Sequence, residues 1–459
     1  MHKLSIGLLS ALAALTISGQ LTSGPVYRDA VATSALISAA TPASISPATP
    51  TALASCQVPA PEIAGAIPAL LDTEMPDGTV VLGGSYLRAG KLVTVLHAML
   101  PGCQPAQGFG VHGTATVTLA VRSTSAVIDV IEATPDGELL LGGGVGPYVV
   151  VGRALADGRI DTGFGISGWS RLQAPVKPPP GMFTGYAITS LAFGPSGTLY
   201  VGGNDGTAHC CVEDFVGALS SGGRLERSFG NDGWATLPGL AGSYQTEIFP
   251  GASGILVMGF VMYTGCGGAV LARLDARGRL DETFDSSVRR SLTSATTRYA
   301  LLGPALYLRP GGGFALVGDL MASGCGPSVP KLAGKGLALG FLANGHIDPS
   351  FGTAGRTEFT YDGSSGTWAV PLPDGSTVVV TEQVPEGDYG APRTLKVREM
   401  SAAGRFSSTL CGSGTCTISL SWAAALNSYP AVDATASPDG PAVIVVVAKQ
   451  RAKVYWVSP

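Results

Sequence analysis

The chain has 459 residues, 65 of them glycine, and only 13% of its residues are charged. Glycine is about twice as frequent, and charge about half as frequent, as in an average globular protein. With 45% hydrophobic residues the chain is not disordered by composition. The net charge of −4 and the lack of a basic run exclude nucleic acid as an expected partner. Such a chain is typical of many short strands joined by tight turns, so we expect an all-β fold.

The first 24 residues have the layout of a secretory signal peptide. His2 and Lys3 precede the apolar run LSIGLLSALAALTI at 4–17, and small residues follow it. The run is too short to span a membrane. We therefore expect cleavage and a secreted or extracytoplasmic protein without a transmembrane helix. A buried N-terminal helix is the alternative, but the next residues give it nothing to pack against.

Residues 25–55 are rich in Ala, Ser, Thr and Pro and predict a flexible linker. The tetrapeptide LASC at 53–56 resembles a bacterial lipoprotein cleavage box. That box needs an apolar run directly upstream, where this chain carries prolines, so a disulfide-bonded Cys56 is favoured.

A turn followed by an apolar strand recurs seven times, as in MPDGTVVLGG at 75–84 and TPDGELLLGG at 134–143. Pro-Asp-Gly between apolar strands indicates a tight turn, because proline presets φ and glycine supplies a positive φ. In the first five copies another glycine follows the turn glycine by five residues. The seven turn glycines are spaced 57 to 65 residues apart: Gly78, Gly137, Gly197, Gly254, Gly313, Gly375 and Gly440.

A second box recurs between these turns. Four full copies read ADGRIDTGFGISGW at 156–169, SGGRLERSFGNDGW at 221–234, ARGRLDETFDSSVR at 276–289 and ANGHIDPSFGTAGR at 343–356. The first unit keeps only GFGVHG around Phe109, and the sixth has Leu410 in place of the phenylalanine. We expect the phenylalanine, and the apolar residue two after the hairpin glycine, to share the core. Seven units of about four strands predict a seven-bladed β-propeller of four-stranded antiparallel blades over 56–459.

The box and the PDG turn together resemble the delta-60 repeat of secreted and surface-associated bacterial proteins, and more distantly NHL-type propeller repeats. The resemblance covers about residues 56–459. It implies a propeller-like all-β fold and transfers no catalytic residue.

The seventh unit ends after its third strand, near Val457, and lacks a fourth. Residues N-terminal to Ile67, around 59–63, are free to supply that strand. We expect this pairing because it removes an exposed edge that would invite aggregation.

Eight cysteines in an exported chain favour disulfides over metal ligation. Cys411 and Cys416 bracket the loop CGSGTC and are expected to pair. Four cysteines lie in the predicted loops between second and third strands, and we expect at least one disulfide among them. The two cysteines nearest the N-terminus, at 56 and 103, could tie the N-terminus to the first unit. Zinc is the alternative, supported only by His209 beside two adjacent cysteines. These six residues are Cys210, Cys211, Cys266 and Cys325 in the loops, with Cys56 and Cys103 remaining.

Acidic residues recur at one position of the box: Asp161, Glu226, Asp281 and Asp348. We expect each to cap a turn by accepting backbone N–H bonds. Calcium binding is the alternative, but the closely alternating acids of a calcium loop are missing.

Catalytic motifs such as G-x-S-x-G and H-E-x-x-H do not occur. No catalytic residue, cofactor or metal site is therefore predicted. The histidines at 97, 112, 209 and 346 fall at different phases of the repeat, and we expect them on the surface or in loops.

Two functions remain open. The first is a monomeric, non-enzymatic module that binds a glycan, peptide or surface partner, or acts as a scaffold, through the long loops that carry Tyr263 and Tyr389. The alternative is a propeller hydrolase or lactonase with a metal or acid pair in the central channel. The expected inner strands are mostly apolar, with Asp129, Glu132 and Glu247 as scattered exceptions.

Overall fold

The computed structural model describes residues 54–59, 71–102, 104–176, 185–205, 213–237, 243–263, 266–295, 299–322, 331–360, 367–372, 374–383, 393–408, 410–420, 431–436, 442–448 and 451–457. This part of the chain is all-β with antiparallel pairing, as predicted, and forms seven sheets numbered here in chain order. The predicted signal peptide and most of the predicted linker lie outside it. Within it, no helix is long and apolar enough to cross a membrane.

The first three sheets each begin with a strand near the centre of the molecule. The first contains β2 (Leu71–Glu74), β3 (Val80–Arg88), β4 (Lys91–Leu100), β5 (Gln104–Pro105) and β6 (Thr114–Ala120), with β5 and β6 both paired to β4. The second contains β7 (Ala126–Ala133), β8 (Leu139–Val145), β9 (Tyr148–Ala154) and β10 (Trp169–Gln173). The third contains β11 (Ala187–Phe193), β12 (Leu199–Asn204), β13 (Asp214–Leu219) and β14 (Trp234–Thr236).

The last four sheets repeat this order with two exceptions, in the fourth and the seventh. The fourth contains β15 (Ser243–Gly251), β16 (Gly254–Tyr263) and β17 (Cys266–Leu274). The fifth contains β18 (Tyr299–Leu308), β19 (Phe314–Ala322), β20 (Lys331–Phe341) and β21 (Arg356–Thr360). The sixth contains β22 (Thr367–Pro371), β23 (Thr377–Gln383), β24 (Thr394–Met400) and β25 (Cys416–Ser419). The seventh contains β26 (Ala431–Ala436), β27 (Ala442–Ala448), β28 (Arg451–Val457) and β1 (Ala54–Pro59).

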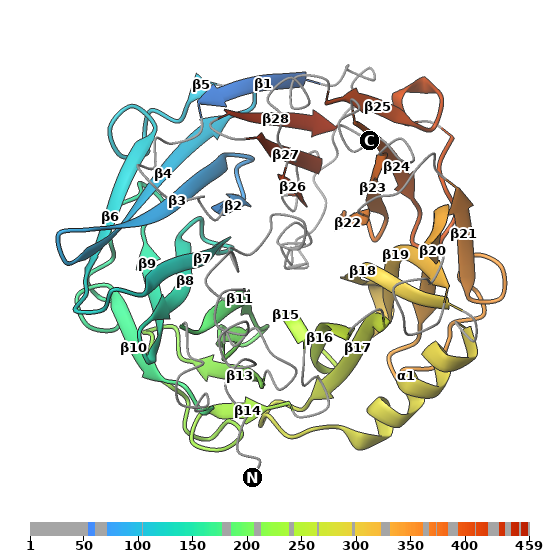
Figure 1. The fold of residues 1–459 in the computed structure, drawn as a ribbon, viewed down its shortest axis with the longest axis horizontal. Helices are drawn as coiled ribbons and strands as arrows, with labels where there is room; N and C mark the ends of the chain where they lie inside the picture. The colour runs from blue at the N-terminus through green and yellow to red at the C-terminus, as the bar shows by residue number, and fades with distance from the viewer. Residues whose placement is uncertain are drawn as a thin grey trace, which may run out of the picture.

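The sheets stand around a common centre, in a propeller-like arrangement (Figure 1). The strands nearest the centre, called inner strands here, are β2, β7, β11, β15, β18, β22 and β26. Each inner strand contacts the inner strands before and after it, and β26 contacts β2. Sheets that face neighbours on both sides bury both faces. For example, every residue of β8 is buried.

In the second and third sheets, the close packing of the next inner strand explains the glycine five residues after the turn glycine. At Gly202, a Cβ atom would lie 2.6 Å from the Cδ1 atom of Ile248 on the next inner strand. At Gly142, it would lie 2.9 Å from Val130 and 3.1 Å from Ile188. These glycines allow the neighbouring inner strand to approach closely.

The box phenylalanines link each sheet to the next. Phe164 is 1% exposed, and its ring lies where a Cβ atom on Gly223, the hairpin glycine of the next box, would come within 2.8 Å. The N–H of Gly165 donates to the carbonyl of Gly222 at 2.9 Å. The same contact joins Phe109 to Gly158, Phe229 to Gly278, Phe284 to Gly345 and Phe351 to Gly404.

The predicted burial of the box is confirmed for the phenylalanines and for Leu410, which is 1% exposed. At the second apolar position it is confirmed only in part, because four of the five residues pack against the core while remaining partly exposed. Leu280 there is 46% exposed, and its equivalents are only half-buried: Ile160, Leu225, Ile347 and Phe406.

The fourth sheet corrects the prediction of four strands in every unit. Its outer strand is replaced by helix α1 (Glu282–Ala295), which packs against β17 (Figure 1). In other boxes the turn needs glycines at positive φ, such as Gly230 (φ 54°) and Gly233 (φ 99°). The fourth box has Asp285 and Val288 at these positions. Without the glycines the chain continues as a helix, and Val288 becomes a buried contact.

The N-terminal strand β1 completes the seventh sheet. It pairs antiparallel with β28 over six residues, from Ala54 opposite Trp456 to Pro59 opposite Arg451. The donated strand therefore lies just N-terminal to the expected residues 59–63, and it includes the last two residues of the predicted linker.

Candidate functional site

The two ends of the sheets differ in character. Because neighbouring strands are antiparallel, the PDG turns and the boxes lie at one end, called the turn end. The loops between second and third strands, and the connections between sheets, lie at the other, called the loop end. Most of the long loops at the loop end lie outside the described residues, but the strand ends that hold them are described.

Buried polar residues gather where strands meet the loop end of the fifth and sixth sheets. The Oγ1 atom of Thr367, the first residue of β22, donates to Oδ1 of Asp319 at 2.5 Å, which joins the two sheets. At the end of β23, Oε1 of Glu382 accepts from Nη1 of Arg393 at 2.7 Å, with both side chains 11% exposed. Burial raises the pKa of Glu382, and the Arg393 charge opposes that rise. These four residues are called the loop-end cluster.

A similar bond joins the third and fourth sheets. The Oγ1 atom of Thr246 on β15 donates to Oδ1 of Asp214 at 2.5 Å, and both residues are fully buried. Asn204 and Asp205, at the end of β12, are also buried. The loop end therefore carries buried polar groups at two separate sheet junctions.

Further polar side chains of the inner strands connect one sheet to the next. The Thr189 hydroxyl accepts from the N–H of Thr246 at 3.0 Å and donates to its carbonyl at 2.7 Å. The Ser190 hydroxyl accepts from the N–H of Ile248, and Oδ2 of Asp129 accepts from the N–H of Ile188 at 3.3 Å. Asp129 thus has a structural role.

The other two acids noted in the inner strands are buried. The pKa of Glu132 on β7 is raised well above its usual range by burial and by the charge of Asp72 on β2. Burial alone raises the pKa of Glu247 on β15, and its Oε2 atom has no hydrogen-bond partner in the described part. The structure thus brings Asp72 and Glu132 together. No group of three or more His, Cys, Asp or Glu residues that could hold a metal occurs among the described residues.

The acids of the boxes cap turns, as predicted, in three copies. The Oδ1 atoms of Asp161, Asp281 and Asp348 accept from backbone N–H groups at 2.9 to 3.0 Å. These bonds and arginine contacts lower the pKa of all three. For Glu226 no side-chain hydrogen bond is present within the described residues.

Sequence reasoning missed the arginines that pair with these acids. Each guanidinium contacts the Oδ2 atom of its aspartate and lies 4.4 to 5.1 Å from the centroid of the box phenylalanine. The pairs are Arg153–Asp161, Arg273–Asp281 and Arg309–Asp348. The first two arginines stand five residues before the hairpin glycine, a spacing that could have identified them.

The predicted disulfide between Cys411 and Cys416 is confirmed. Cys56 and Cys266 lie on β1 and β17, but their side chains are outside what the structure describes. Cys103, Cys210, Cys211 and Cys325 also lie outside the described residues, as do His209 and Tyr389. Tyr263 ends β16 at the loop end, where its backbone pairs with Cys266.

The histidine prediction is wrong for His97. It lies on β4, half-buried, with Nδ1 3.0 Å from the Thr114 hydroxyl, and burial lowers its pKa. His112 and His346 are exposed, as predicted.

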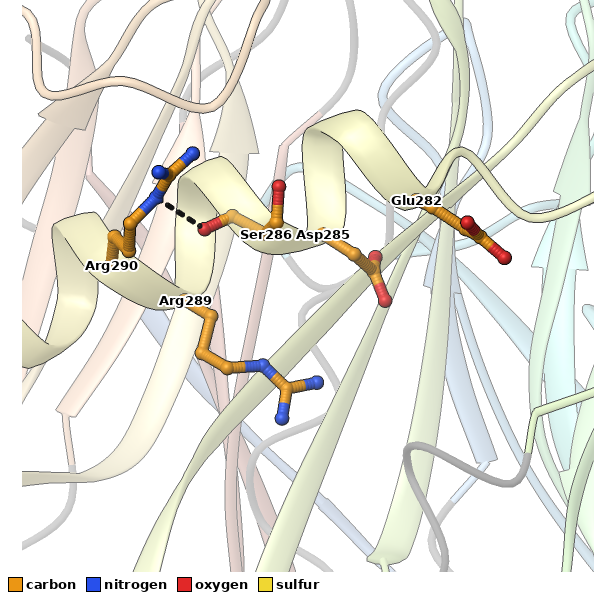
Figure 2. A pocket seen from close by; sticks show the side chains of 5 residues that line it. All are labelled: Glu282, Asp285, Ser286, Arg289 and Arg290. Carbon is orange, nitrogen blue, oxygen red and sulfur yellow. Dashed lines mark hydrogen bonds between the residues drawn. The ribbon is translucent and has the colours of Figure 1, made fainter.

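One surface hollow lies on the outside of the molecule against α1 (Figure 2). Its five lining side chains all come from this helix: Glu282, Asp285, Ser286, Arg289 and Arg290. The Arg290 side chain donates to the carbonyl of Ser286 at 3.1 Å, and burial raises the pKa of Asp285. Because a single helix supplies every group, the hollow is a feature of the helix surface.

No family model matches the chain, and no curated protein matches it. Among solved structures, the chain is similar to virginiamycin B lyase from Staphylococcus aureus, with 10% identity and a TM-score of 0.46 over 88% of this chain and 100% of that one. It is similar to the polysaccharide lyase Uly1, with 9% identity and a TM-score of 0.45 over 84% and 89%. It is also similar to an alpha-L-arabinanase from Penicillium chrysogenum, with 12% identity and a TM-score of 0.38 over 72% and 92%. No activity is assigned to the chain from these similarities.

Proposed function

We propose that the protein is a secreted module that binds an extracellular ligand, such as a glycan, a peptide or a surface partner, through its loop end. The supporting observation is the loop-end cluster, in which Glu382 and Arg393 form a buried ion pair beside Asp319 and Thr367. A buried ion pair costs desolvation, and apolar residues would often fill the same space with more stability. The opposite end is a repeated frame of turns and boxes, and loops held by a rigid frame are where binding usually resides.

We further infer that the seven sheets are the blades of one closed seven-bladed propeller, with β1 as the fourth strand of the last blade. The contacts of β26 with both β22 and β2 support this. The N-terminal pattern supports signal-peptide cleavage and export, and the repeated box supports membership of the delta-60 repeat family.

The binding proposal is tested with the mature chain and three substitutions. Retention on insoluble chitin, cellulose and peptidoglycan, and on arrayed glycans and peptides, would identify a ligand. Tyr263→Ala and Tyr389→Ala, in segments that the sequence predicts as long loops, should weaken its binding about fivefold or more, as expected for aromatic contacts. Ile166→Ala is the matched control, because Ile166 is 85% exposed at the turn end. Loss of binding in the control alone would show that the ligand binds the other end.

A propeller hydrolase or lactonase is the second candidate, and the Asp72–Glu132 pair favours it. A carboxylic acid kept neutral beside a second carboxyl group is an arrangement that acid–base catalysis uses. A panel of lactone, ester and glycoside substrates tests it. Activity in the native chain that is lost in Glu132→Gln and kept in Glu247→Gln would support an enzyme, and no turnover by the native chain would reject it.

A further inference from the structure

Arg398 on β24 lies between two phenylalanine rings at the junction of the fifth and sixth sheets. Its guanidinium carbon is 5.1 Å from the ring centroid of Phe359 on β21 and 4.6 Å from that of Phe406. The two rings meet edge to face, with centroids 5.5 Å apart. Stacking on aromatic rings holds a guanidinium in place but uses none of its N–H donors.

Two donors of Arg398 are unused. Its Nε and Nη2 atoms are buried and have no hydrogen-bond partner in the described part of the chain. Buried donors without partners are rare in native proteins, because each one costs its full desolvation free energy. Burial also lowers the pKa of Arg398.

Other arginines of the same molecule show what is missing. Arg153, Arg273 and Arg309 lie over box phenylalanines, which Phe359 and Phe406 are not, and each bonds to the box aspartate. In the sixth box the aspartate position, three residues after the hairpin glycine, is Ser407. Arg398 stands six residues before the hairpin glycine Gly404, whereas Arg153 and Arg273 stand five before theirs, so it is not their repeat equivalent. It resembles them in stacking on aromatic rings and differs in having no bond to a carboxylate in the described part of the chain.

A second cation lies on the same face. Lys396 precedes Arg398 by two residues on β24, so both side chains point to one side of the sheet. Its Nζ atom donates to the hydroxyl of Thr417 on β25 at 2.9 Å. Neither cation forms an ion pair with a carboxylate among the described residues. Both charges therefore lack a carboxylate partner within the described residues.

We propose that Arg398 and Lys396 form an oxyanion site that takes a carboxylate or sulfate group. The planar guanidinium can offer Nε and Nη2 together to two oxygens of one group, which is the geometry arginine uses for carboxylates and phosphates. Arg398 is half-buried, so part of its side chain remains in contact with solvent. Its Nε and Nη2 atoms are buried, so an anion reaches them only when neighbouring side chains move. The site lies apart from the loop-end cluster and does not depend on the binding proposed there.

Isothermal titration calorimetry of the mature chain tests the proposal, with ionic strength held constant by chloride. Sulfate and acetate test a free anion, and oligogalacturonate tests a carboxylate carried by a polymer, with its methyl ester as the neutral control. We expect saturable binding of at least one of these anions and none of the ester. Arg398→Met should weaken binding about tenfold or more, since two charge-assisted hydrogen bonds are lost. Arg398→Lys should also weaken it, because lysine keeps the charge without the paired donors.

Arg405→Met is the matched control, because Arg405 is an exposed arginine of the same box. It should bind as the native chain does. Thermal unfolding without anion separates a binding role from a structural one: Arg398→Met should melt at the same temperature as the native chain or higher, since unmet donors are removed. No saturable binding by the native chain, equal binding by Arg398→Met, or a lower melting temperature with unchanged binding would each overturn the proposal.

Discussion

At the scale of single residues, each box phenylalanine serves two sheets at once. Phe229 is 3% exposed, and its ring centroid lies 5.8 Å from that of Tyr200 and against Gly278 of the next box. Phe229→Ala should cost about 3–5 kcal/mol of unfolding free energy, because it empties a buried site that the neighbours cannot refill. Denaturant unfolding measures this. Ile166→Ala, at an exposed position, should change the value by less than about 0.5 kcal/mol.

From the raised pKa of Glu247 we expect the free energy of unfolding to depend on pH. Burial raises its pKa in the folded state above the ordinary value of 4.5. Its stabilising contribution is therefore complete below the unfolded-state pKa and is lost as the pH rises through the folded-state pKa. Glu247→Gln removes this titration, so the variant should be more stable than the native chain at pH 8. Unfolding curves at pH 4 and pH 8 check this, and an equal difference at both values would contradict it.

The sequence predicted the turn-capping role of the box aspartates because the residue recurs at one spacing. It did not predict their arginine partners as a set. Two of these arginines precede the hairpin glycine, but Arg309 comes from a different place, directly after the end of β18. Because the arginine that pairs with the box aspartate comes from two different positions of the repeat, it does not recur at one spacing in the sequence.

At the scale of elements, α1 shows how two residues change a strand to a helix. Replacing Asp285 and Val288 with glycine should lower the helix content measured by circular dichroism. Glycine within a helix costs about 1 kcal/mol per residue, and the buried Val288 side chain is also lost. Asp285→Ala with Val288→Leu, which keeps helix-forming residues, should retain the helical signal.

The disulfide belongs to one short element, the loop before β25. Replacing both Cys411 and Cys416 with serine should cost roughly 2 kcal/mol of unfolding free energy, the value expected for closing so short a loop. Reductant should lower the stability of the native chain by a similar amount and leave the double variant unchanged. A response of the double variant to reductant would point to further disulfides.

The loop-end cluster could not be predicted from the repeat. Its members come from β19, β22, β23 and the residue before β24, and Asp319 and Glu382 stand at positions that are apolar or small in most other units. A single buried acid within an apolar strand looks like an isolated exception until the sheets are placed side by side. The long loops were expected because their lengths vary while the strands do not, and most of them lie outside the described residues, so this stays a prediction.

At the scale of the whole molecule, the seventh sheet depends on β1. Removing residues 1–60 deletes this strand and exposes the edge of β28, so thermal stability should fall and self-association should rise. Removing residues 1–53 leaves β1 intact and is the matched control. Calorimetry and light scattering measure both effects, and identical melting of the two truncations would show that β1 contributes nothing.

The sequence was most informative at this scale, because the first five units repeat a turn glycine, a close-packing glycine and a box phenylalanine in fixed order. These residues predicted the all-β sheets and the use of the N-terminus to complete the last one. The exact donor strand was misplaced by a few residues, because β1 has no repeat signature of its own and was located only by the prolines and spacing around it.

The pairing of β1 with β28 also sets the order of events when the chain folds. The first strand to leave the ribosome or cross a membrane has its partner almost 400 residues later, near the C-terminus. Six sheets can form from neighbouring segments as they emerge, but the seventh must wait until β28 has been synthesised or exported. Folding should therefore end with a slow docking step that joins the two chain ends, because contacts distant in sequence form late. A circular permutant that places β1 directly after β28 should lose that step and fold faster in stopped-flow refolding.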